Sequence, residues 1–240
     1  MNVDKPIKSS THHSLGLSTR VTIKSEMQKR QVELKGLQAS IVLTLKDENE
    51  KVVEKKELPA NSFVLNFMRL LYTALTASSY NVKDTSGATV SAKLSKVEKH
   101  VSYEVEYRRT EYERIVAGYQ AWCPKEDDSH GILVGNGTAT VNPEDYNLSS
   151  KIPNGTDSGQ LIYLASEVEE TGVVGNEAHL FLKRSFINHS GAGITVREIG
   201  LAVRQFSPET DILIIRDLLT EFEVPDNYTL DTQYTLEVAV

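Results

Sequence analysis

The sequence is poor in cysteine and in long hydrophobic runs, and both shortages narrow the class of protein. The single cysteine among 240 residues, Cys123, can form no internal disulfide, which excludes a disulfide-stapled extracellular scaffold. No stretch approaches the roughly 18 consecutive apolar residues of a membrane span. The N-terminal sequence MNVDKPIKSSTHHSLGLSTR lacks the apolar core of a secretory signal peptide. We therefore expect a protein that is made in a cytoplasm and has no membrane contact.

Acidic side chains outnumber basic ones outside the N-terminal region. The formal net charge is -7, but residues 1–36 contain seven Lys and Arg against three Asp and Glu, so they carry +4 and the remainder carries -11. Because this region mixes Ser, Thr, His, Lys and Gln without a persistent hydrophobic period, we predict an extended arm. A basic arm can reach an acidic partner. That partner is the body of another copy or, less favoured, a nucleic acid.

Short alternating runs dominate residues 37–240, which we assign to one body. With 40% hydrophobic residues in the chain, this length can bury the core of an all-β domain. Alternation over residues 37–46, a polar turn at 47–50 and a second run from Val52 indicate a hairpin. Further strand-like runs are HVSYEVEY, ILVG, QLIYLAS, AHLFLKRSF, ITVREIGLAV, ILIIRDLL and YTLDTQYTLEVAV. Turn residues between them predict an antiparallel β-sandwich or jelly-roll-like body.

One segment has the period of an amphipathic helix. In NSFVLNFMRLLYTALTA, residues 61–77, apolar side chains recur at three- and four-residue spacing after a candidate N-cap at Asn61 or Ser62. We expect the apolar face to lie in the core or against a partner; its central residues are Val64, Phe67, Met68, Leu71 and Leu75.

Two features of the C-terminal strands carry predictions. In FINHSGAGITVREIGLAVR, the apolar positions change parity between Val196 and Ile199, which predicts a β-bulge at Arg197–Glu198 that keeps Glu198 off the inward face. The last run, Tyr228–Val240, alternates to the end of the chain, so we expect a paired interior strand. Its predicted partner is the strand at 194–204 or ILIIRDLL.

The residues with chemical potential form no specific catalytic pattern. Cys123 precedes His130 by seven residues, and such a pair could act as a nucleophile and base, but a lone cysteine beside Trp122 is more simply packing. His12–His13 could bind a metal ion only with further ligands, so an arm exposed to solvent is the favoured interpretation.

The turn-rich segment at 135–160 is similarly unspecific. Gly135–Thr138 lacks the lysine and the following helix of a phosphate-binding loop. Asp127–Asp128, Asp145 and Asp157 do not have calcium-loop spacing. No pair of carboxylates is singled out for glycoside cleavage. We therefore predict no catalytic, cofactor-binding or metal-binding residues, and no cofactor.

Several segments together resemble structural proteins of tailed-phage virions. They are ILVGNGTATVNPEDYNLSSKI, RSFINHSGAGITVREIGLAV, LIIRDLL and VPDNYTLDTQYTLEVAV, with SFVLNFMRLLYTALT and VKDTSG upstream. The resemblance covers roughly residues 38–82 and 131–240, and its motifs are structural. It implies a virion subunit of the head, connector or tail, and it supplies no catalytic residues.

The resemblance and the composition lead to the same functional expectation. We expect a non-enzymatic virion structural protein that assembles with other copies of itself and with other virion proteins, partly through its arm. The alternative is a receptor- or glycan-binding protein of a tail fibre or tip. A virion-associated hydrolase is a third hypothesis, which two converging carboxylates in a cleft would favour.

Overall fold

The computed structural model describes residues 37–60, 62–94, 97–103, 109–115, 118–174, 177–206 and 208–239. The chain divides into two units between Lys35 and Gly36, and the fold described here is that of the second unit. The arm predicted over residues 1–36 lies outside the described residues.

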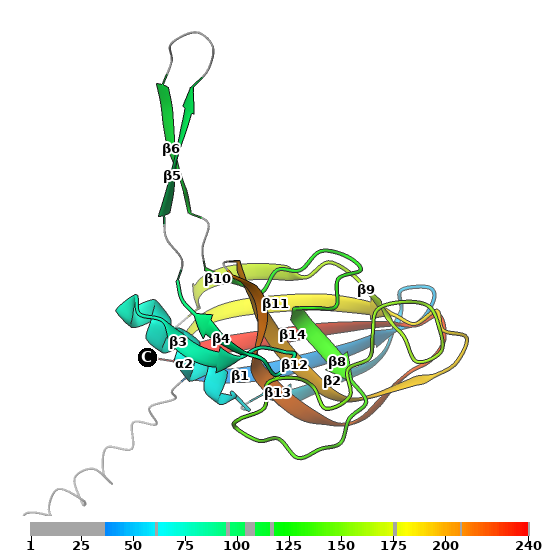
Figure 1. Cartoon of the computed structure of the whole chain (residues 1–240). Helices are drawn as coiled ribbons and strands as arrows, with labels where there is room; N and C mark the ends of the chain where they lie inside the picture. The colour runs from blue at the N-terminus through cyan, green and yellow to red at the C-terminus, as the bar shows by residue number, and fades with distance from the viewer. Residues whose placement is uncertain are drawn as a thin grey trace, which may run out of the picture. The chain divides into compact units, whose positions relative to one another are not determined.

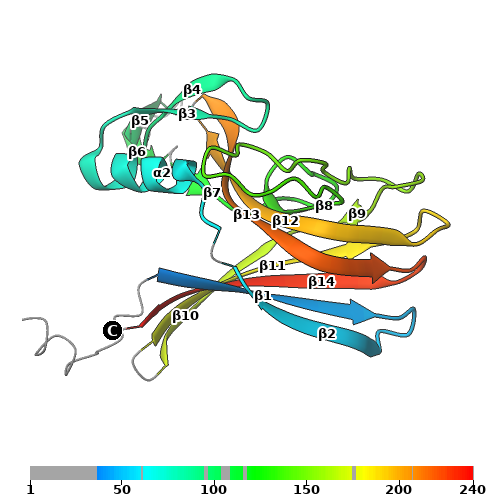
Figure 2. The ribbon, with the colours of Figure 1, turned by 90° about the horizontal axis from the view of Figure 1, so that it is seen from below.

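Two antiparallel sheets face each other (Figures 1 and 2). The first contains β1 (Leu37–Lys46), β2 (Val52–Pro59), β9 (Ile162–Tyr163), β10 (Glu167–Val174), β11 (Glu177–Ile187) and β14 (Thr229–Ala239). Its order is β10-β11-β14-β1-β2, and β9 pairs with β11. The second contains β7 (Tyr119–Gln120), β8 (Gly131–Gly135), β12 (Ile194–Phe206) and β13 (Glu209–Val224). In it, β12 pairs with β13, β7 and β8. The predicted mainly-β, sandwich-like fold is confirmed.

One hydrophobic cluster joins the two sheets. It includes Ile41 and Tyr234 of the first sheet and Ile199 and Ile212 of the second, each fully buried. The second sheet is also covered on its other face by the loop at 136–161. Gly200 permits this contact, because a Cβ at that position would lie 2.9 Å from the Leu148 side chain. Double coverage explains why β8 is buried at every residue rather than alternating.

Four further strands form two separate hairpins. β3 (Tyr80–Lys83) pairs with β4 (Thr89–Ala92), and β5 (Val97–Tyr103) pairs with β6 (Arg109–Ile115). β5 confirms the strand predicted for the first part of HVSYEVEY, whereas residues 104–108 lie outside the described residues.

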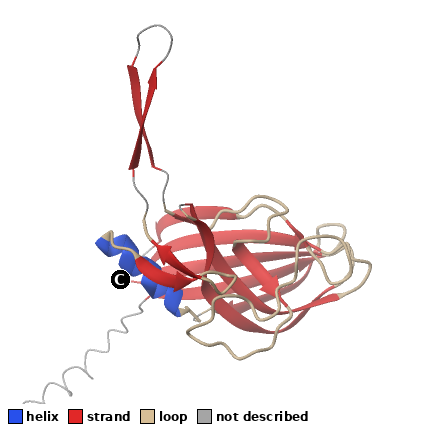
Figure 3. Ribbon diagram, in the orientation of Figure 1, coloured by secondary structure: helices blue, strands red, loops and turns tan. Residues whose placement is uncertain are grey.

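The helix, α2, spans Leu65–Thr76, and Figure 3 shows it against the strands. The predicted cap at Asn61 or Ser62 is wrong, since the N-cap is Val64 and makes no side-chain capping bond. The preceding residues pair with β13 instead, through a bridge between Phe63 and Ile215. The predicted inward face is also wrong in part, because Asn66, Leu70 and Thr73 are the buried residues.

The C-terminal strand confirms one expectation and corrects another. β14 is an interior strand that pairs with β1 along one edge and with β11 along the other. The predicted partners were wrong, because β12 and β13 pair with each other in the opposite sheet. The turn that follows Val224 carries the chain from one sheet to the other.

The predicted irregularity at Arg197–Glu198 is confirmed, as the β12–β13 register shifts between Val196 and Glu198. Residues 219–221 of β13 face Arg197 alone, so the additional residues lie on β13 and not, as predicted, on the strand that contains Arg197. Beyond the shift, Leu201 and Val203 face the first sheet, while Glu198 faces the 136–161 loop. Glu198 is nevertheless fully buried.

The FINHSG motif forms a corner that joins both sheets. Asn188 is fully buried, and its side-chain amide donates hydrogen bonds to the carbonyls of Ala192 and Val224, at 2.8 and 2.7 Å. Its backbone N–H donates to Tyr228, and its carbonyl accepts from Asn227. The β11–β12 and β13–β14 turns are thereby held together. The motif therefore contributes to architecture.

Candidate functional site

Glu198 organises the turn-rich loop from inside the protein. Its carboxylate accepts hydrogen bonds from the backbone N–H groups of Gly137, Ser149 and Ser150, at 3.2, 3.0 and 2.7 Å. Arg216, 1% exposed, approaches the same carboxylate at 2.9 Å and also pairs with Asp145 at 2.6 Å. This buried ion pair and its hydrogen bonds fix the loop on the second sheet.

The two glycines of the VGNG sequence let the backbone lie close to the Glu198 carboxylate. A Cβ at Gly135 would lie 2.7 Å from Glu198 Oε1, and one at Gly137 would lie 2.4 Å from the same atom. Only glycine allows the backbone to approach so closely. The segment that superficially resembled a phosphate-binding loop therefore surrounds an internal anion.

A second polar cluster surrounds the cysteine. Arg184, also 1% exposed, donates to five backbone carbonyls, those of Pro124, Asp127, His130, Ile132 and Leu164. Its guanidinium thereby fixes the chain from 124 to 132 against β11.

Cys123 and His130 do come together in this cluster. The thiol sulfur lies 3.5 Å from Nδ1 of His130, and Nε2 of the ring donates to the Trp122 carbonyl at 2.9 Å. Both side chains are buried. Burial raises the pKa of the Cys123 thiol and lowers the pKa of His130. An activated nucleophile requires a lowered thiol pKa, so the arrangement favours packing over catalysis.

The same cluster offers three potential metal ligands, because Cys123, Asp127 and His130 place donor atoms within 4.8 Å of one another. Asp127 is already engaged, however: Ser129 donates to its carboxylate, and Arg204 lies 3.8 Å away. Although burial acts in the opposite direction, the Ser129 hydrogen bonds hold the Asp127 pKa below its usual range. With Arg184 and Arg204 nearby, we assign no cation to this cluster.

The other polar residues considered in the sequence do not come together in one site. Asp128 pairs with Lys151, and Asp145 with Arg216. Tyr146 is the one tyrosine in the 138–160 loop, and its ring packs beside Lys83. His12–His13 lies outside the described residues.

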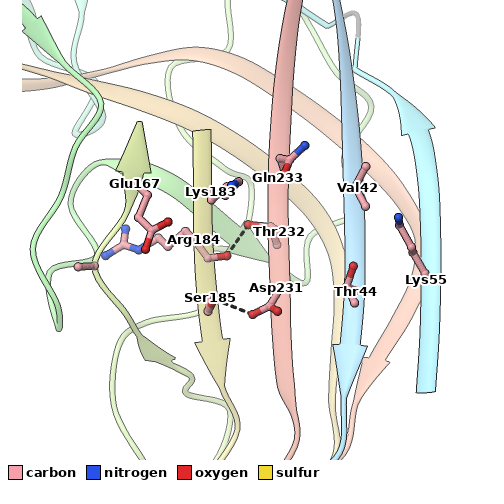
Figure 4. Close-up of a pocket in the computed structure, with 11 residues that line it drawn as sticks. Val42, Thr44, Lys55, Glu167, Lys183, Arg184, Ser185, Asp231, Thr232 and Gln233 are labelled. Carbon is pink, nitrogen blue, oxygen red and sulfur yellow. Dashed lines mark hydrogen bonds between the residues drawn. The ribbon is translucent and has the colours of Figure 1, made fainter. Parts of the chain in front are cut away.

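Figure 4 shows a pocket on the first sheet, with a volume of about 340 Å³. Its side chains come from neighbouring strands and are mainly polar; they include Thr44, Lys183, Ser185, Asp231 and Gln233. Ser185 donates to Asp231 at 2.6 Å, and Lys46 pairs with the same carboxylate at 2.6 Å. The Asp231 carboxylate is therefore already bound by other side chains of the protein.

An apolar groove of about 440 Å³ opens between the two sheets. Leu180 and Leu236 line it from the first sheet, and Val203 and Ile214 line it from the second. Trp122, 46% exposed, and Val168 of β10, 45% exposed, also border it. We call this feature the end groove, because it lies at the end of the sandwich opposite the Asn188 corner.

The helix exposes a second apolar surface. Met68, Leu71 and Leu75 are 57%, 40% and 78% exposed, and they lie at three- and four-residue spacing on one face of α2. We call these three residues the helix stripe. Sequence periodicity left open whether the core or a partner covers this face, since it shows that a face is apolar but not what covers it. The burial of the polar residues Asn66 and Thr73 shows that the body covers a different face of α2.

No helix in the described part of the chain has the length and hydrophobicity of a membrane span. Comparisons with protein-family models, with curated proteins and with solved structures found no match for this chain.

Proposed function

We propose that this chain is a non-enzymatic structural subunit of a tailed-phage virion, which contributes to head, connector or tail assembly by self-association. The observation that carries this proposal is the exposed helix stripe. Large contiguous apolar surfaces on soluble proteins commonly mark association sites. The motif resemblance in residues 38–82 and 131–240 supports the virion setting.

A second copy is the partner that best fits the helix stripe. Arg69 is the only charged residue of α2, and it reaches to the side toward Glu144 at 3.7 Å. Two stripes can therefore pack against each other without like charges at their centre. Such a contact, with the same surface on both subunits, is the usual form of a two-fold interface.

The test of self-association compares variants by molar mass in solution. In the full-length protein, Met68→Lys/Leu75→Lys should lower the mass at concentrations at which the wild type is oligomeric. Val52→Lys/Val53→Lys is the matched control, because it places the same charges on exposed apolar positions of β2. A control that dissociates equally, or a wild type that stays monomeric at all concentrations, would contradict the proposed interface.

The virion setting has its own test. Purified particles of a phage that encodes this chain should contain it in a fixed number of copies, visible by mass spectrometry and by imaging with the subunit labelled. The absence of the chain from intact particles would overturn the proposal.

A second candidate function, recognition of a glycan or receptor, is favoured by the polar pocket in Figure 4. Its hydroxyl, amide and charged groups can hydrogen-bond to sugar hydroxyls. Glycan-array binding by the full-length protein, abolished by Lys183→Ala/Gln233→Ala but not by the β2 control, would establish it. Binding that persists in the pocket variant would exclude this pocket.

A further inference from the structure

The end groove lies beside an open sheet edge. β10 is the last strand of the first sheet, and it pairs only with β11 among the described strands. Val168 of β10 points into the groove, so an added strand beside β10 would place alternate side chains in the same space. Its other side chains would lie on the outer face with Glu167 and Glu169.

The outer face at this edge is acidic. Glu167 lines the polar pocket on that face, and Glu169, half exposed, pairs with Lys183. An occupant that alternates apolar residues with residues that include basic ones would therefore fit both faces. Opposite charges on neighbouring strands stabilise such a pairing.

The chain itself contains a segment with this pattern. In RVTIK, residues 20–24, Val21 and Ile23 share one parity, and Arg20 and Lys24 share the other. As a strand beside β10, the segment would direct Val21 and Ile23 into the groove and Arg20 and Lys24 toward the glutamates. Strand β1 also begins at this end, because Leu37 pairs with Val238 and Ala39 with the groove residue Leu236.

We propose that the end groove binds residues 20–24 from the N-terminal region of a second copy, as a strand added to β10. The charge distribution favours exchange between copies. Bodies that each carry -11 repel one another, and a segment from the +4 region offsets that repulsion when it binds a neighbour. This inference rests on the proposed function only in that the donor is another subunit.

The only tryptophan reports directly on occupancy. Trp122 borders the groove, and residues 1–36 contain no aromatic residue. Tryptophan emission therefore comes from Trp122 alone. Covering a half-exposed indole moves its emission to shorter wavelength and reduces quenching by acrylamide.

The experiment measures Trp122 emission of the full-length protein over a dilution series, in parallel with molar mass. We expect emission to shift to shorter wavelength and quenching to fall as mass rises. Val21→Asp/Ile23→Asp should abolish the emission change, while Ser9→Asp/Thr11→Asp, which adds the same two charges to the N-terminal region, should retain it. A synthetic peptide of residues 15–34, added to the Val21→Asp/Ile23→Asp variant, should restore the shift.

Two results would overturn the inference. Emission that does not change with concentration and remains typical of an exposed indole would show an empty groove. Emission that is shifted at every concentration in a monomer would show that the segment binds within its own chain. A helix-stripe variant of lower mass than the wild type that still associates and still shows the Trp122 response would separate this inference from the proposed interface.

Discussion

At the residue scale, the buried ion pair of Glu198 and Arg216 gives the sharpest prediction. Glu198→Gln keeps the volume but leaves a buried guanidinium with a weaker partner and places an amide among N–H donors. We expect a loss of about 3 to 5 kcal/mol in the free energy of unfolding, measured by urea denaturation. Glu221→Gln is the matched control, because Glu221 pairs with Arg197 at the surface, and it should change stability by no more than about 0.5 kcal/mol. Equal effects of the two substitutions would contradict the role of Glu198.

Cys123 illustrates how proximity differs from chemical activation. Its thiol is buried, and its raised pKa keeps it protonated, so native protein should react slowly with a thiol reagent and quickly once unfolded. Cys123→Ser should cost on the order of 1 kcal/mol, because it changes packing, a weak hydrogen bond to the Asp127 carbonyl and the contact with His130. Rapid reaction of the native thiol would indicate an accessible, activated cysteine.

Asp217 should make stability fall with rising pH. Burial raises the pKa of this carboxyl above its ordinary value of 3.8, although its Oδ1 atom accepts a hydrogen bond from the Ser62 N–H, at 3.2 Å. The folded state therefore holds the proton more tightly than the unfolded state, so the stabilisation is complete below pH 3.8 and is lost as pH rises through the folded-state pKa.

The test is Asp217→Asn, which keeps the acceptor for Ser62 and removes the buried charge. The variant should gain stability relative to the wild type as pH rises from 4 to 7, in urea unfolding at each pH. Glu48→Gln removes one exposed charge and should show no such trend. A difference that stays constant with pH would mean that Asp217 does not titrate in this window.

At the element scale, alternation located the strands because one face of each meets a core. It located β1, β11, β12 and β14 closely, whereas β13 extends beyond the ILIIRDLL run at both ends. It could not identify the partners of β14, since alternation does not show which strands share a sheet. It could not decide what covers the helix stripe for a related reason: an apolar face can be covered by the chain or left for another molecule. The site was harder still, as Glu198 and its loop partners are about 50 or more residues apart.

The central position of β14 predicts an asymmetric response to truncation. Deleting residues 235–240 removes Leu236 and its pairing with both Ala39 and Leu180. We expect a loss of at least about 3 kcal/mol, seen as a lower Tm in a thermal melt. Deleting residues 1–6 instead should leave Tm unchanged. If the C-terminal deletion melts like the full-length protein, β14 does not close the sandwich.

At the scale of the whole molecule, stability and association occupy different parts of the fold. Buried ion pairs, the Arg184 hydrogen bonds and the Asn188 corner hold the loops in place, while the helix stripe and the end groove remain exposed. Substitutions in the stripe or the groove edge should therefore change assembly with little change in Tm. This separation lets solution mass and thermal melting test the proposals independently.

The Asn188 corner should make its end of the sandwich open less often than the groove end. At that end, side-chain and backbone bonds link the turns of both sheets; at the other, the groove leaves the sheets unsealed. Openings that expose backbone amides should therefore begin at the groove end and progress toward the corner. In hydrogen–deuterium exchange, the amides of residues 229–234 should be protected longer than those of 236–239, although both sets lie on one strand. Uniform exchange along β14 would show that the corner does not restrain the sheets.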